Sequence, residues 1–107
     1  MSRSIAEELL ARVREQIHGI GARPGPSALA VYCWVLGVMS YEGVRVLEVT
    51  PSQIHLGVVV GGNARYTGVG FSLNTIKSSL EILEHHGWLI ISRKPAKKGE
   101  ILRIETP

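Results

Sequence analysis

The sequence predicts an α+β fold that is mainly α-helical and ends in a β-hairpin. Two observations predict the helices: apolar residues recur at spacings of three and four, and capping residues stand before these segments. The hairpin is predicted by two short apolar runs, 88–93 and 101–105, that flank a turn at 95–100. A length of 107 residues suits one domain, which we expect to span residues 1–107.

The first predicted element is an N-terminal helix within residues 1–20. Ser4 and Glu7 have the spacing of a capping box, and Gly19 and Gly21 are expected to end the helix. Its apolar stripe consists of Ile5, Leu9, Val13 and Ile17. Such a helix either forms a dimer contact or closes the core of a monomer, and the dimer contact is the favoured interpretation.

The second predicted helix begins at Pro26 or Ser27 and runs to about Ser40. Proline is suited to a first helical turn, and the segment is apolar nearly all round, which indicates a buried central helix. Cys33 lies within it and is expected to be a small core residue rather than a nucleophile.

A short strand is predicted at 44–49, and a third helix at 51–60. Thr50, Pro51 and Gln53 provide the N-cap, the first helical position and the capping-box partner of that helix. Ile54 and Val58 are expected to face the core. Four glycines within 61–70 then predict a mobile loop.

The last predicted helix follows Ser72, its expected N-cap, and ends on Gly87. Its apolar stripe is Leu73, Ile76, Leu80 and Leu83, which should face the core. Positive charge is concentrated just after it. Residues 88–103 carry five basic side chains and one acidic side chain, whereas the whole chain has a net charge of only +3. Such a local basic segment is typical of a surface that faces a polyanion, although a solvated hairpin tip has the same composition.

A helix, a glycine stop, a strand, a basic turn and a second strand have the layout of a recognition helix followed by a wing. The motif residues are Thr75-Ile76-Lys77, Leu80, Leu83, Glu84 and Gly87-Trp88-Leu89. In this pattern the sequence resembles the winged helix-turn-helix family over residues 27–105, and the resemblance implies a DNA-binding winged-helix core. The chain departs from the family at 61–70, because the turn before a recognition helix usually has about 3–4 residues.

The DNA contacts are predicted first on the recognition helix. Placed at 100° per residue, Asn74 and Ser78 point most directly away from the core, and such side chains read base edges. Thr75 and Lys77 are assigned to phosphates, and the N-cap Ser72 is counted with them. The wing residues expected to contact the DNA backbone are Arg93, Lys94, Lys97 and Lys98.

Arg65 and Tyr66 lie at the centre of the predicted loop. A glycine-rich backbone can approach a phosphate closely, so both residues are candidate DNA contacts. A plain surface loop and a contact with a partner subunit are the alternative interpretations.

The sequence lacks the patterns typical of enzymes, metal-binding proteins and membrane proteins. No carboxylate pair or Ser-His-Asp set stands out, so we expect no enzyme and no cofactor. The adjacent His85 and His86 would point about 100° apart on a helix, which disfavours a metal site. The sequence has no run of about 18 apolar residues, so we expect no membrane span. The single cysteine and the lack of a secretory signal pattern favour the cytoplasm.

The sequence therefore predicts a small cytoplasmic regulator that binds double-stranded DNA as a homodimer. A repressor that acts by occupying DNA is the main hypothesis. Plasmid or phage replication or partition is the alternative within DNA binding. A winged-helix scaffold for protein interactions, without DNA binding, is the alternative from another class.

Overall fold

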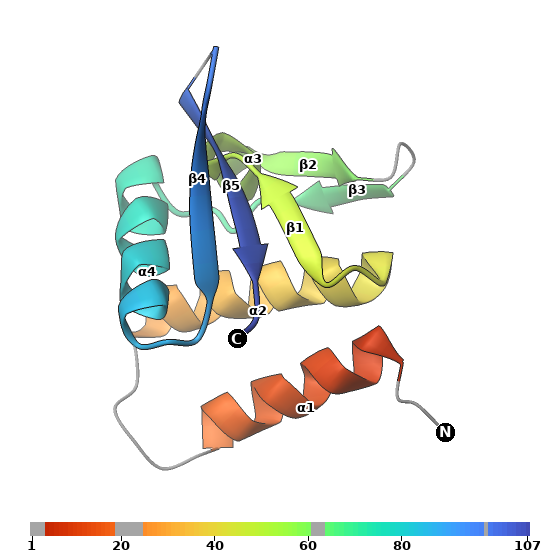
Figure 1. Cartoon of the computed structure of the whole chain (residues 1–107). Helices are drawn as coiled ribbons and strands as arrows, with labels where there is room; N and C mark the ends of the chain where they lie inside the picture. The colour runs from red at the N-terminus through yellow and green to blue at the C-terminus, as the bar shows by residue number, and fades with distance from the viewer. Residues whose placement is uncertain (1–3, 19–24, 61–63, 98) are drawn as a thin grey trace.

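A computed structural model of the chain describes residues 4–18, 25–60, 64–97 and 99–107, without the side chains of residues 17, 18, 58–60, 64 and 65. Its helices and strands, in chain order, are α1 (Ile5–His18), α2 (Pro26–Glu42), β1 (Val46–Val49), α3 (Pro51–Leu56), β2 (Gly57–Val60), β3 (Ala64–Thr67), α4 (Leu73–His85), β4 (Ile90–Ala96) and β5 (Gly99–Glu105). Helices pack around a three-stranded antiparallel sheet, so the predicted α+β class is confirmed (Figure 1).

Helix α2 lies at the centre of the fold, as predicted. Its buried residues are Ala28, Val31, Tyr32, Val35, Leu36, Val38 and Met39. The helix ends at Gly43, whose φ of 66° is the left-handed conformation that glycine tolerates best. The prediction that Cys33 is a core residue was wrong, because Cys33 lies on the exposed side of α2. An all-apolar helix gives no sequence signal for which narrow strip faces solvent.

The main sheet has the strand order β1-β5-β4, with both pairs antiparallel. Its buried face carries Leu47, Val49, Ile91, Leu102 and Ile104. Strand β1 pairs only with residues 102–105 of β5, from Val49↔Leu102 to Val46↔Glu105. Strands β4 and β5 continue beyond that point as a hairpin, whose described pairs end at Ala96↔Gly99. The turn is therefore shorter than the predicted 95–100.

The segment 57–67 was predicted wrongly. Helix α3 ends at Leu56 rather than at residue 60, because Gly57 takes a φ of 112°, which lies outside the helical region. The valines that follow form β2, which pairs antiparallel with β3 from Gly57↔Thr67 to Val60↔Ala64. Part of the predicted loop at 61–70 is thus a second hairpin. Residues 61–63 of that loop, and the Val58 side chain expected in the core, lie outside the described residues.

Helix α1 packs against α2 (Figure 1). The Ser4 hydroxyl accepts a hydrogen bond of 3.2 Å from the Glu7 N–H, as the predicted cap requires. Leu9 is buried, and Ile5 and Val13 pack against the same core. The helix therefore contributes to the core of its own chain. The Ile17 side chain and the predicted stop at Gly19 and Gly21 lie outside the described residues.

Candidate functional site

Helix α4 begins at a cap that uses two of the predicted site residues. The Ser72 Oγ accepts a hydrogen bond of 3.3 Å from the Thr75 N–H and donates to the Thr75 Oγ1 at 3.0 Å. Ser72 therefore stabilises the first turn, where helix N–H groups otherwise lack partners. The predicted N-cap is confirmed, and Ser72 and Thr75 both lie at the start of α4.

The two faces of α4 differ sharply in chemistry. Ile76, Leu80 and Leu83 are buried, as the apolar stripe predicted. The prediction that Leu73 also faces the core was wrong, since Leu73 is 37% exposed and lies at the first turn, beyond the packed part of the helix. Asn74, Lys77 and Ser78 are exposed. The first half of α4 thus presents small polar side chains, one lysine and part of Leu73 to solvent.

A shallow groove of about 370 Å³ runs along one side of this exposed surface. It lies between α4 and the first turn of α2. Its lining residues are Gly25, Pro26, Ser27, Ala28, Asn74, Thr75, Ser78, Ser79 and Ile82. The structure thereby brings three predicted contact residues, Asn74, Thr75 and Ser78, to one place beside the N-terminus of α2.

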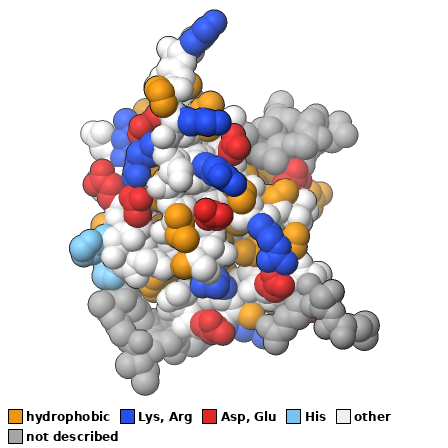
Figure 2. Space-filling model, in the orientation of Figure 1, with side chains coloured by type: hydrophobic (Ala, Val, Ile, Leu, Met, Phe, Trp, Pro, Cys, Tyr) orange, Lys and Arg blue, Asp and Glu red, His pale blue; other side chains and the backbone are white. Residues whose placement is uncertain are grey.

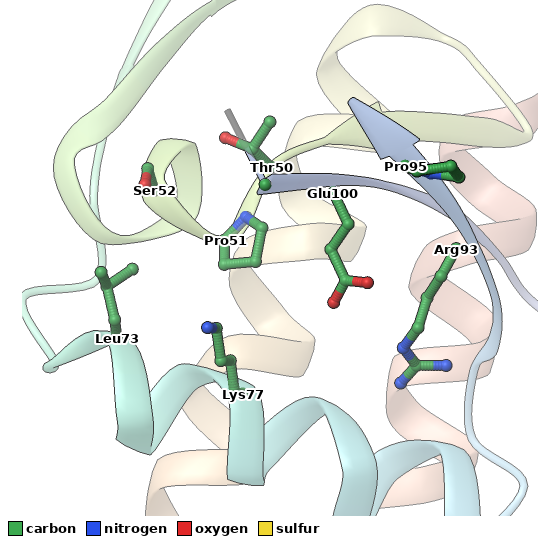
Figure 3. A pocket seen from close by; sticks show the side chains of 9 residues that line it. Thr50, Pro51, Ser52, Leu73, Lys77, Arg93, Pro95 and Glu100 are labelled. Atoms are coloured by element: carbon green, nitrogen blue, oxygen red, sulfur yellow. The ribbon is translucent and has the colours of Figure 1, made fainter. Parts of the chain in front are cut away.

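A second groove, of about 460 Å³, lies on the other side of α4 (Figure 3). Its walls are α4, the start of α3 and the β4–β5 hairpin. The side chains of Lys77 and Glu100 point into it, from α4 and β5 respectively. Leu73, Thr50, Pro51, Ser52, Arg93, Pro95 and Gly99 complete the lining. The Lys77 side chain thus extends from α4 toward the β4–β5 hairpin across this groove.

Arg93 is paired with a carboxylate of α4. Its two terminal nitrogens donate hydrogen bonds of 3.0 and 3.3 Å to the two carboxylate oxygens of Glu84. That side-chain hydrogen bond raises the pKa of the Arg93 guanidinium above its usual value. The sequence placed Arg93 with the phosphate contacts and gave no sign of this partner.

Two other basic residues of the β4–β5 hairpin, Lys94 and Lys97, are exposed. Lys94 lies on the outer face of the sheet in a hollow of about 390 Å³, which Arg103 and Glu48 also line. Lys97 is exposed close to the turn, and Lys98 lies outside the described residues. In Figure 2 basic side chains extend along the β4–β5 hairpin to its tip, interspersed with acidic ones lower on the sheet. Arg103 pairs with Ser92 across the β4–β5 ladder. Its side chain therefore lies on the same face of the sheet as those of Ser92 and Lys94.

Tyr66 lies elsewhere. Its hydroxyl donates a hydrogen bond of 2.9 Å to Glu42 at the end of α2, and its ring packs edge-on against Tyr41. The β2–β3 hairpin extends on the opposite side of the molecule from α4 (Figure 1). The structure therefore does not bring Tyr66 together with the residues of α4 and the wing. The Arg65 side chain lies outside the described residues.

The β2–β3 hairpin was missed although the sequence holds a signal for it. Three consecutive β-branched valines, the turn residues 61–63 and then Ala64–Thr67 have the pattern of two short strands around a glycine turn. The capping box at Thr50 led instead to a helix extended over the valines.

Two further classes of site can be addressed within the described residues. No group of three or more His, Cys, Asp and Glu side chains there is arranged to hold a metal ion. No helix among them has the length and hydropathy required to span a membrane.

Comparisons with models of known protein families, with curated proteins and with solved structures give no match.

Proposed function

We propose that this chain is a winged-helix protein that binds double-stranded DNA, with α4 as its recognition helix and the β4–β5 hairpin as its wing. The observation that carries the proposal is the exposed first half of α4. Asn74 and Ser78 face solvent there, and Lys77 points into the groove beside the wing. A single α-helix fits the major groove of B-form DNA, and such side chains pair with base edges and phosphates.

The order and pairing of the elements also support the proposal. Helix α2, strand β1, helices α3 and α4, and strands β4 and β5 follow one another as in a winged helix, with the β2–β3 hairpin inserted before α4. Strand β1 pairs with the edge of β5 opposite β4, so the base of the proposed wing belongs to a three-stranded sheet. Because β4 follows α4 directly, helix and wing lie next to each other (Figure 1).

The distribution of charge favours docking through the first half of α4. The acidic residues Glu81 and Glu84 lie in the second half, where they would repel phosphates. Exposed basic residues lie on the wing instead, at Lys94, Lys97 and Arg103. Recognition helices commonly approach the major groove through their N-terminal residues.

The proposal includes a homodimer that acts by occupying DNA, as a repressor does. Two recognition helices related by a two-fold axis would contact half-sites about one helical turn apart. Leu10 on α1 is 52% exposed, which makes α1 the candidate contact. Light scattering after size exclusion tests this part: the mass of a dimer that falls to that of a monomer in Leu10→Gln supports α1 as the contact. A monomer at all concentrations contradicts it.

Fluorescence anisotropy with a random-sequence duplex, titrated at several salt concentrations, tests DNA binding itself. We expect binding that weakens steeply as salt rises, because phosphate neutralisation releases counterions. Absence of binding at low salt would refute the proposal and favour a protein-interaction scaffold.

The recognition helix is tested after the preferred sequence has been selected from a random library. Asn74→Ala should then lower the preference for the selected site by roughly tenfold or more, since a bidentate contact provides about 1–3 kcal/mol of discrimination. Binding to random DNA should change little. His85→Ala is the matched control, because His85 is exposed on the last turn of the same helix. An equal loss in both variants would contradict base reading by Asn74.

A further inference from the structure

Arg93 and Lys94 are adjacent basic residues that lie on opposite faces of β4. The strand alternates, so Ser92 and Lys94 share the outer face, with Arg103 of β5 beside them. Arg93 instead lines the groove on the α4 side, together with Lys77 and Glu100 (Figure 3). The two side chains therefore meet different surroundings although the sequence places them side by side.

Arg93 also stands where the wing leaves the sheet. It is paired with Leu102, which in turn is paired with Val49 at the end of β1. Beyond this position the described wing consists of β4 and β5 alone. A two-stranded hairpin without further support is only marginally stable in water. Its orientation therefore depends on the contacts made at its base.

The contact at this base is the bidentate pair with Glu84. Both nitrogens of the guanidinium fork meet both carboxylate oxygens, at 3.0 and 3.3 Å, and both side chains are 37% exposed. Parallel hydrogen bonds of this kind fix orientation as well as distance. They connect the last turn of α4 to the last position of the three-stranded sheet, just before the hairpin continues alone.

The charges around Arg93 oppose a role as a phosphate ligand. Glu84, Glu100 and Glu81 all act on it electrostatically. A phosphate entering this groove would meet Glu100 beside Lys77, and the Arg93 guanidinium is already paired with Glu84. Lys94 has only Glu48 among the acidic residues that line its hollow.

We propose that Arg93 and Glu84 are positioning residues that set the angle between the wing and the recognition helix, and that Lys94 makes the phosphate contact. The angle matters because α4 and the wing must reach one duplex at the same time. That consequence depends on the proposed DNA binding, whereas the angle itself is a property of the free protein.

The first test measures the angle without DNA. Spin labels at Ser78→Cys on α4 and Lys97→Cys on the wing, in a Cys33→Ser background, report the helix-to-wing distance distribution by pulsed electron resonance. All three positions are exposed. We expect Glu84→Gln and Arg93→Gln each to broaden or shift the distribution, and the exchanged pair E84R/R93E to restore it. Glu81→Gln and Lys94→Gln are the matched controls and should leave it unchanged. Identical distributions in all variants would overturn the proposal.

The second test separates a positioning residue from a phosphate ligand. Each phosphate contact contributes about 0.9 to the slope of log affinity against log salt. Lys94→Gln should lower that slope by about this amount on a random-sequence duplex, whereas Arg93→Gln should leave it unchanged, although both remove one positive charge. An equal fall in both variants would overturn the assignment of Arg93. If the wild-type protein does not bind DNA, the proposed function fails, and the distance measurement still decides whether the pair sets the angle.

Discussion

Two antiparallel hairpins in the described part of the chain, β2–β3 and β4–β5, differ in length and in surroundings. The β4–β5 hairpin belongs to a three-stranded sheet and extends beyond it with exposed basic residues. The β2–β3 hairpin forms a sheet of its own and is held against α2 by side chains. The Trp34 Nε1 donates a hydrogen bond of 2.7 Å to the Thr67 carbonyl, and Tyr66 bonds to Glu42. The β4–β5 hairpin is anchored at its base, where it joins the sheet. The β2–β3 hairpin is attached to α2 along β3.

The segment that follows the inserted hairpin, residues 68–71, is also bonded closely to α3. The Val69 N–H donates to the Ile54 carbonyl at 3.0 Å, and the His55 Nδ1 hydrogen-bonds to the Phe71 carbonyl. Gly68 lies so close to His55 that a Cβ there would overlap its carbonyl oxygen. The two hairpins therefore differ in attachment: β2–β3 is bonded to the helices beside it, whereas the basic residues described on β4–β5 beyond the sheet remain exposed.

The largest expected effect comes from breaking the attachment of the inserted hairpin. Gly68→Ala should destabilise the protein by about 3 kcal/mol, the upper range for over-packing an interior, because the added Cβ would overlap the backbone of His55. Urea unfolding followed by circular dichroism measures the change. A loss below about 0.5 kcal/mol would mean that the chain moves away from α3 without cost, and the hairpin would then not be held as described.

The second prediction breaks the free hairpin instead. Lys97→Ala with Lys98→Ala should lower the salt slope of binding to random duplex by about 1.8, since each phosphate contact contributes about 0.9. Urea unfolding should be unchanged because Lys97 is exposed. Anisotropy at several salt concentrations gives the slope. A wild-type slope in this variant would remove the wing tip from the interface.

The third prediction concerns the Tyr66 hydroxyl. Tyr66→Phe removes the bond to Glu42 and should cause a modest loss of stability, smaller than that of Gly68→Ala, with DNA binding unchanged. Partial burial, with the Glu42 hydrogen bond, raises the pKa of Tyr66 from 10.0 to about 12. A raised pKa means that the stabilisation is fully present below pH 10 and is lost as pH rises toward 12.

Urea midpoints of wild type and Tyr66→Phe should therefore converge between pH 10 and 12. A constant difference across that range would contradict the role of the hydroxyl. Weakened DNA binding at neutral pH would place Tyr66 at the interface, as the sequence first indicated.

The smallest expected effect is that of Gly37→Ala, which is the control for Gly68→Ala. Gly37 lies on the exposed side of α2, and a Cβ added there has no atom within 4 Å. Gly37→Ala should stabilise the protein by about 0.5–1 kcal/mol, because glycine is unfavourable inside a helix. The same urea experiment measures it. A destabilisation would show that this face of α2 is covered, for example by a second copy of the chain.

The sequence alone determined the elements whose signals are local. The cap at Ser72, the capping box of Thr50 with Gln53, and the apolar stripe of Ile76, Leu80 and Leu83 all act within a few residues. Such signals identify a helix before any tertiary contact forms. The same is true of the two apolar runs that form the strands of the wing.

Only the tertiary structure decided which side chains meet across elements. Alternation along a strand puts the adjacent Arg93 and Lys94 on opposite faces, but only the packed structure shows that Arg93 meets Glu84 and that Lys94 lies on the outer face of the sheet. Nothing local exposes Cys33 within an apolar helix. In 57–67 the capping box before the valines favours a helix and the valines themselves favour a strand, and the contacts of the hairpin with Trp34 and Glu42 accompany the second outcome. These outcomes depend on contacts between residues that are distant in sequence. Such contacts contribute to stability only after the helices and strands have packed together.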